Sequence, residues 1–225
     1  MTHIQSMESI ESALRSPTEE FVDASIHGLG CLLSLVAGLF LVGRATQTGD
    51  PWCVGSCAFY ISTLVSVYAA STLSHLFFPD RINRLFRRLD QGFIYLLIVG
   101  SFTPFILVYL RTPFWLSFYF VILAVAVGGC ISKVFFAHRV DRIAVWLYVT
   151  LGWMESFAAI PMFDLVPLNA LLWVLYGGLC YSIGVIFLVT DIRRWHFHSI
   201  WHLLVIAGSA CHYYAILRYV VERQS

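Results

Sequence analysis

Charged residues are scarce in this chain of 225 amino acids, and their scarcity excludes several classes of protein. They make up 12% of the sequence, whereas soluble domains carry roughly 25%. Thirteen acids and fourteen bases are too few to coat the water-facing surface of a domain this size. A net charge of +1 gives no electrostatic reason to expect DNA or RNA as a partner. Soluble domains, disordered chains and nucleic-acid modules are therefore excluded.

Cysteine pairs and a targeting segment are missing as well. The six cysteines form no CxxC motif, and a helix holds Cys53 and Cys57, four residues apart, too far apart for a disulfide. We expect the cysteines to act as small buried hydrophobes, which excludes a secreted disulfide scaffold. Residues Met1 to Glu20 are polar and lack an apolar core, so we expect no signal peptide.

Long apolar runs dominate the rest of the chain: 59% of the residues are hydrophobic and the mean hydropathy is +0.78. Seven runs reach the ~20 residues that a helix needs to cross a bilayer. We therefore predict an all-α membrane protein, a seven-transmembrane helix bundle over residues 24–220, with an N-terminal segment (1–23) and a short tail (221–225). The predicted spans are Ala24–Gly43, Trp52–Phe78, Asp90–Leu110, Pro113–Phe136, Arg142–Pro161, Leu168–Val189 and Ser199–Val220.

The distribution of lysine and arginine orients the predicted bundle, because cytoplasmic loops carry an excess of both residues. A cytoplasmic N-terminus places ten of them inside and four outside. The inner ten are Arg15, Arg81, Arg84, Arg87, Arg88, Lys133, Arg139, Arg142, Arg193 and Arg194, and the outer four are Arg44, Arg111, Arg218 and Arg223. We therefore expect the N-terminus in the cytoplasm, a short cytoplasmic segment before the first span, and the C-terminal tail outside.

Polar side chains in membrane spans are costly, so each one is a candidate for function. Five of them, from four predicted helices, fall at one depth near the cytoplasmic ends of the spans: His27, His75, Asp90, His198 and His202. The charge count did not use these residues, so their shared depth is independent evidence for a site. Mid-span Glu155 and the deeper His212 are weaker candidates, for substrate or proton passage and for a buried polar contact respectively.

The spacing of the histidines points to a metal. His198 and His202 lie four residues apart, on one face of a helix, and two imidazoles so placed can bind one divalent ion. His75 from a facing helix would complete a set of three, leaving the open fourth position of a catalytic zinc site. Asp90 would orient or deprotonate a water there, and Ser71, one turn from His75, would reach the water or a ligand. The alternative is three unrelated histidines that bond to backbone or lipid headgroups.

Taken together, these motifs resemble a known family. The set Glu20…His27, Ser71-x3-His75, Leu89-Asp90-x-Gly92 and His198-x3-His202-x9-His212 resembles the progestin and adipoQ receptor family, and looks most like its bacterial hemolysin III branch. The resemblance implies an intramembrane zinc ion (Zn²⁺) held by His75, His198 and His202, with Asp90 and Ser71 positioning its water. It also implies a bacterial inner membrane location.

One position departs from the family pattern. The first motif of the family typically carries Asn four residues before the histidine, whereas this chain has Asp23. A carboxylate there changes the charge near His27.

Several functions remain open from the sequence. The first is a zinc-dependent hydrolase of lipid amide or ester bonds, by analogy with the alkaline ceramidases that the family resembles. The second is a membrane receptor or regulator of lipid homeostasis with structural zinc. A hemolysin III-type cytolytic protein is the third, although seven apolar spans argue against a secreted toxin. A proton-coupled transporter that uses Glu155 is the fourth. Membrane lipids are the expected partners, and a lipid the expected substrate.

Overall fold

In the computed structural model, the described residues are 16–76, 78–190 and 196–224, without the side chains of residues 137–144 and 224. Several bases that the charge count assigned to the inner side lie outside this description: Arg15, Arg193 and Arg194 entirely, and Arg139 and Arg142 in their side chains. Most of the N-terminal segment, residues 1–15, lies outside it too, as does the final residue of the predicted tail.

The described residues form helices joined by short turns, with no strand among them. Six helical stretches are long and apolar enough to cross a membrane, so the predicted all-helical, multi-pass membrane protein is confirmed. The elements are α2 (Pro17–Thr46), α3 (Pro51–Ser74), α4 (Asp80–Tyr109), α5 (Pro113–Glu155), η1 (Ser156–Ala158), α6 (Ala159–Met162), α7 (Leu168–Thr190), α8 (Phe197–Ile216), the π turn η3 (Leu217–Val221) and the 3-10 turn η4 (Glu222–Gln224).

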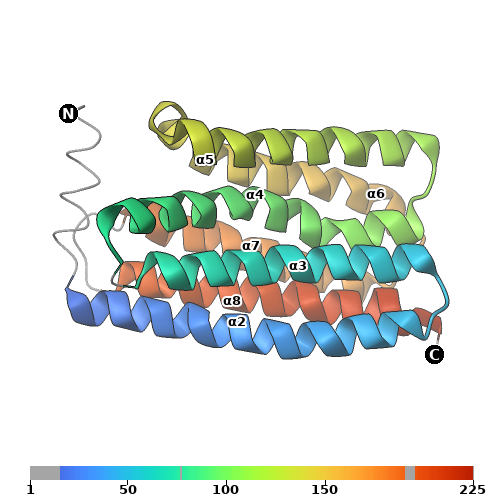
Figure 1. The fold of residues 1–225 in the computed structure, drawn as a ribbon. Helices are drawn as coiled ribbons and strands as arrows, with labels where there is room; N and C mark the ends of the chain where they lie inside the picture. The colour runs from blue at the N-terminus through green and yellow to red at the C-terminus, as the bar shows by residue number, and fades with distance from the viewer. Residues whose placement is uncertain (1–15, 77, 191–195, 225) are drawn as a thin grey trace.

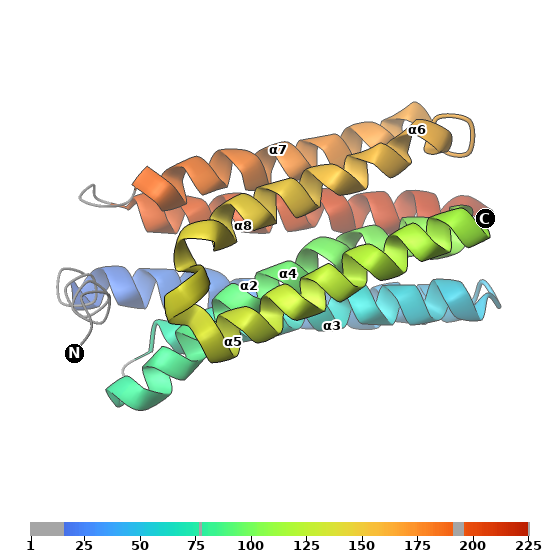
Figure 2. The same cartoon turned by 90° about the horizontal axis from the view of Figure 1, so that it is seen from above.

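Helix α5 contains the fourth predicted span and most of the fifth, whose last residues lie in η1 and α6. Its backbone is not helical at Phe136 (φ −126°, ψ 30°), the residue at which the fourth predicted span ends. The ribbon turns back beyond this point, and the second half of α5 runs toward α6 in the opposite direction (Figure 2). The part before the kink, Pro113–Phe136, is one of the six membrane-length stretches.

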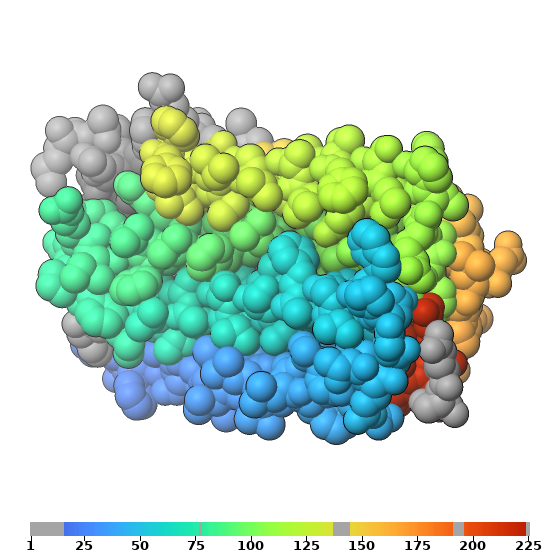
Figure 3. Space-filling model, turned by 45° about the vertical axis from the view of Figure 1, so that its right-hand side comes forward, coloured from blue at the N-terminus to red at the C-terminus, as the bar shows by residue number. Residues whose placement is uncertain are grey.

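The helices lie in one bundle with roughly parallel axes. Helices α2, α3, α4 and the first half of α5 lie side by side and form one continuous face (Figures 1 and 3). Helix α8 packs against both α7 and α2, which connects the last helix to the first. Helix α2 begins at one end of the bundle and α8 finishes at the other (Figure 1).

Capping side chains mark the starts of α2, α3 and α5. Ser16 and Glu19 form a reciprocal capping box ahead of Pro17, which satisfies two of the free N–H groups at the helix start. Asp50 and Thr112 cap α3 and α5 by accepting one backbone N–H each, from Trp52 and Trp115, and each is followed by proline. The capping box begins α2 two turns before the predicted span at Ala24, because a capped helix can continue beyond the hydrocarbon core.

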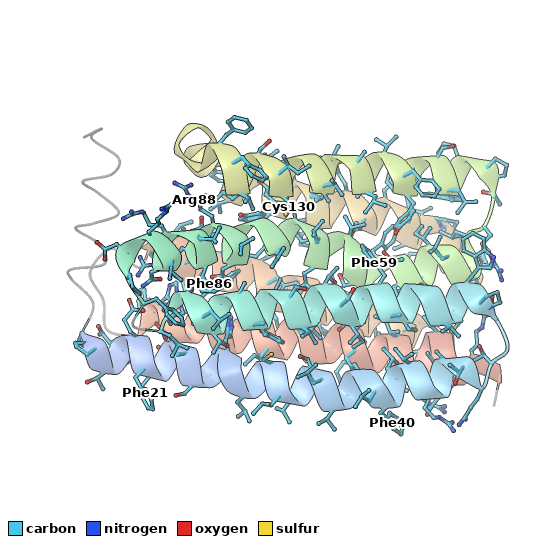
Figure 4. All side chains as sticks on the ribbon, in the orientation of Figure 1. Phe21, Phe40, Phe59, Phe86, Arg88 and Cys130 are labelled. Carbon is cyan, nitrogen blue, oxygen red and sulfur yellow. The ribbon has the colours of Figure 1, made fainter. Side chains whose placement is uncertain are left out.

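Apolar side chains cover the outside of the bundle, as lipid requires. Leu32, Val36 and Leu39 on α2 are 64%, 69% and 80% exposed. Phe21 and Phe40 project from the same helix away from the bundle (Figure 4). In water this surface would be an unusually large apolar patch; in a bilayer it is the lipid-facing surface.

Ion pairs gather at the end of the bundle where α2 finishes. Asp50 pairs with Arg111 at 3.3 Å and with Arg223 at 3.9 Å, and Glu222 pairs with Arg44 at 3.7 Å and with Arg218 at 3.5 Å. These four arginines are the ones that the charge count assigned to the outer side. The polar residues near His75 lie at the opposite end.

Candidate metal centre

The first turns of α2 present a buried polar face. Because the capping box begins the helix at Pro17, Glu20, Asp23 and His27 follow at spacings of three and four residues, which places them on one side of the helix. All three side chains are buried. This face points toward the last turn of α3 and the first turns of α8.

Two other elements meet it there. His75 follows the last residue of α3 and caps that helix. His198 and His202 occupy the first two turns of α8, which the chain enters through His196 in the left-handed conformation (φ 65°). The structure therefore brings the three histidines that the sequence singled out to one place, together with Asp23 from α2.

The distances within this cluster are short. One ligand atom from each of Asp23, His75, His198 and His202 lies within 4.8 Å of the others. The Nε2 atoms of His75 and His202 face each other at 3.1 Å. His75 and His202 are both buried and His198 is half-buried. We call these four residues the His–Asp cluster.

Glu20 fixes the orientation of His75. Its Oε2 lies 2.7 Å from Nδ1 of His75, so Nδ1–H donates to the carboxylate, and a ring that binds a metal would do so through the lone pair on Nε2. Arg87 Nη2 lies 3.7 Å from the other carboxylate oxygen. The lone pair of His75 is thereby directed at Nε2 of His202. Carboxylates hold metal-binding imidazoles in this way.

Asp23 and His27 complete the surroundings. The Ser199 hydroxyl donates a hydrogen bond to Oδ1 of Asp23. The His27 ring packs 3.8 Å from that of His202 and 5.1 Å from that of Tyr68, centroid to centroid. Both ring nitrogens of His27 are buried and make no hydrogen bond within the described ranges. His27 therefore lies beside the cluster and outside the set of four.

Asp90 and Ser71 border the same cluster. The Asp90 carboxyl is close enough to Ser71, His75 and Arg87 to interact with each of them. It does not belong to the four groups within 4.8 Å of one another. Ser71 is fully buried, and its hydroxyl makes no hydrogen bond of regular geometry to the described residues. The catalytic roles that the sequence assigned to Asp90 and Ser71 remain predictions.

These residues fit a divalent metal ion. The 3.1 Å contact between the Nε2 atoms of His75 and His202 is a hydrogen bond when one of them carries a proton, and the same two atoms would be free to bind a cation when neither does. Three imidazoles and a carboxylate are common zinc ligands, and the buried Ser71 hydroxyl next to Asp90 offers a water or ligand a hydrogen-bond partner. The cluster can thus hold a metal, and its donor atoms alone do not select zinc from other divalent ions that bind imidazole.

The two weaker candidates lie elsewhere. His212 is buried and stacks on Tyr181, with centroids 5.5 Å apart and an angle of 13° between the planes. Its ring packs against Gly177 of α7, and its Nδ1 makes no hydrogen bond with the described residues, so the buried polar contact expected from the sequence stays a prediction. Glu155 ends α5, and its Oε1 is buried without a hydrogen bond from the described part of the chain.

The sequence interpretation missed three contributions. Asp23 was noted as a departure from a family pattern and not as a member of the cluster. Neither the contact of Glu20 with His75 nor that of Ser199 with Asp23 was foreseen. The spacing of Glu20, Asp23 and His27 on one helix face was the signal that could have found the first two.

Comparison with known proteins agrees with the motifs. The family described as haemolysin-III related matches residues 15–213. A hemolysin-3 of Bacillus cereus is 34% identical over 207 residues, which cover 92% of this chain and 94% of the relative. A hemolysin-3 homolog of Bacillus subtilis is 31% identical over 204 residues (91% and 95%).

Animal proteins match as well. The human monocyte to macrophage differentiation factor is 29% identical over 167 residues, which cover 74% of this chain and 68% of that protein. No solved structure matches the chain significantly. The motifs, the helical membrane architecture and the relatives agree: this chain belongs to the haemolysin-III-related branch of the progestin and adipoQ receptor family.

Proposed function

We propose that this protein is a zinc-dependent intramembrane hydrolase of lipid amide or ester bonds. The observation that carries the proposal is the convergence of His75, His198 and His202 with Asp23 from three helices of a membrane bundle. A site inside a bilayer meets lipids before other molecules, and the exposed apolar face of the bundle lets lipids approach it from the side.

A zinc ion held by these imidazoles would supply a water with a pKa near 7. Side chains of this chain would transfer the protons and position the reactants. Asp90, next to Ser71 and His75, would take a proton from the attacking water and return it to the leaving amine or alcohol. The Ser71 hydroxyl would hold the water or the lipid carbonyl in line. The products would be a fatty acid and the lipid amine or alcohol.

We also propose that the His–Asp cluster lies at the cytoplasmic side of the membrane. Seven spans, with the segment after the kink at Phe136 as the fifth, would carry the chain from an inner N-terminus to an outer C-terminus. The position of the four outer arginines at the end opposite the His–Asp cluster supports this orientation. The bacterial relatives support an inner-membrane location.

Hydrolysis by the purified protein in detergent or liposomes tests the function. Wild type should release fatty acid from ceramide-like amides or from ester lipids, and His202→Ala should lose nearly all of that activity. His196→Asn is the matched control, because it changes an exposed histidine of the same segment to a residue that tolerates the left-handed backbone. Equal turnover by His202→Ala and wild type would refute a metal-dependent hydrolase.

A second function is favoured by one feature of the cluster. Four protein ligands are the usual number in structural zinc sites, and catalytic sites use three. With Asp23 counted, the cluster offers four, which suits a receptor or regulator whose metal stabilises the bundle. In that case His75→Ala would lower the unfolding temperature of the metal-loaded protein, and no lipid would be turned over.

A further inference from the structure

The structure points to Asp23 as a fourth ligand of the metal, so that the site of this chain is a His3–carboxylate set instead of three imidazoles and an open position. The inference rests on the metal site of the proposed function and goes beyond it. It gives the departure at position 23 a chemical role: the residue that differs from the family pattern is part of the coordination sphere.

Geometry is the first argument. Ligands at 2.0–2.2 Å around a tetrahedral ion are roughly 3.3–3.5 Å apart. One oxygen of Asp23 and one nitrogen of each of the three histidines already lie within 4.8 Å of one another. Small rotamer adjustments would close the set onto one ion. Asp90, the carboxylate that the sequence favoured, is not within this distance of all three imidazoles.

Burial and charge are the second argument. Asp23 is 1% exposed, and a buried carboxylate is costly unless a cation or hydrogen bonds compensate it. Ser199 supplies one hydrogen bond, to Oδ1. A dication among the neighbouring imidazoles would add a strong attraction of opposite charge to the contacts that Asp23 already makes. The same hydrogen bond orients the carboxylate as second-shell partners orient metal ligands.

With Asp23 among the ligands, four protein side chains would fill the site, and the hydrogen bond from Ser199 would hold the carboxylate there. Asp23 would have to move before a water or a lipid oxygen could take its place. The fourth ligand would also raise metal affinity above that of three histidines.

Affinity measurements with cobalt and zinc on the full-length protein in detergent test the inference. Loss of a residue that hydrogen-bonds to a metal ligand lowers metal affinity about 10–100-fold, so loss of a ligand itself should lower it by more than that. We expect Asp23→Asn to weaken binding more than about 100-fold, and more than Glu20→Gln does. Asp80→Asn, a change of an exposed carboxylate at the same end of the bundle, should have no effect. An Asp23→Asn loss no larger than that of Glu20→Gln would overturn the inference.

A gain of signal provides a second test that does not depend on weakened binding. In Asp23→Cys, a thiolate ligand should give cobalt a strong near-ultraviolet charge-transfer band that wild type lacks. Bound cobalt without this band would show that position 23 is outside the coordination sphere. If wild type binds neither ion, the metal site itself fails, and with it the proposed function. If wild type binds cobalt or zinc, Asp23→Asn keeps the same metal affinity and Asp23→Cys shows no charge-transfer band, then only the assignment of Asp23 as a ligand is refuted.

Discussion

At the scale of single residues, metal binding by the His–Asp cluster depends on the orientation of its imidazole rings, and His75 shows how one ring is oriented. Glu20 accepts from Nδ1 of His75 at 2.7 Å, and Arg87 restrains the same carboxylate. A neutral ring whose Nδ1–H is occupied presents Nε2 to a metal without any competing tautomer. Glu20 is therefore a positioning residue that acts through His75.

We expect Glu20→Gln to weaken metal binding about 10–100-fold while the fold is kept, because a residue that hydrogen-bonds to a metal ligand raises metal affinity by this factor. The measurement is a chelator competition on purified protein. Glu19→Gln is the matched control: it is the adjacent carboxylate, and glutamine preserves the capping box with Ser16. Equal losses in both variants would mean that charge near the helix start matters and the contact with His75 does not.

Residue identities and spacing were enough to predict part of this centre. The i,i+4 spacing of His198 and His202 and the shared depth of His75 predicted that these three imidazoles lie close together. In the structure they do, whereas binding of a metal by them stays a prediction. The contributions of Glu20, Asp23 and Ser199 depend on how α2 is rotated against α3 and α8, and a single sequence does not reveal that rotation. The predicted first span, beginning at Ala24, also left Glu20 and Asp23 outside the bundle.

At the scale of helices, small residues decide which faces come together. Glycines let the backbones of neighbouring helices approach closely. In the pairs Gly128–Gly129 and Gly177–Gly178, only Gly129 and Gly177 lie where an added Cβ would meet another helix. A Cβ on Gly177 would lie 2.6 Å from the His212 ring and 3.1 Å from the carbonyl oxygen of Gly208, whereas one on Gly178 would meet nothing within 4 Å. Helix α8, which carries two of the three histidines, is thus held closely against α7.

Alanine at the two neighbouring positions should therefore have opposite consequences. Gly177→Ala forces α7 and α8 apart, and overpacking of this kind costs about 1–3 kcal/mol. Gly178→Ala adds a methyl group toward lipid and should leave stability unchanged or slightly raised. Thermal unfolding in detergent measures both. A destabilised Gly178→Ala variant beside an unaffected Gly177→Ala variant would contradict the packing described for this interface.

At the scale of the whole molecule, composition and hydropathy predicted the class of fold because bilayers accept few architectures. The helix boundaries were less predictable: α4 begins at Asp80, ten residues before the predicted span, because an arginine-rich helix end outside the hydrocarbon core carries no hydropathy signal. The break at Phe136 coincides with the predicted end of the fourth span, where the polar segment 138–142 begins. The hydropathy pattern did not show that the backbone stays helical through this polar segment, so that one kinked helix, α5, holds the fourth span and most of the fifth.

Topology follows from the number of crossings. Seven spans place the two ends of the chain on opposite sides, and six place them on the same side. A phosphatase that is active only outside the cytoplasm should therefore be active when fused after Gln224 and inactive when inserted before Asp80. Activity at both positions, or at neither, would refute the odd number of spans. Activity of the insertion before Asp80 would refute the cytoplasmic assignment of the His–Asp cluster.

The central claim is that imidazoles from α3 and α8 bind one divalent ion, and elemental analysis of the purified protein tests it most directly. Wild type should contain one equivalent of zinc or a similar divalent metal per chain, and His198→Ala should contain much less at equal purity and folding. A wild-type protein without metal after metal-supplemented expression, or an unchanged content in His198→Ala, would contradict the account.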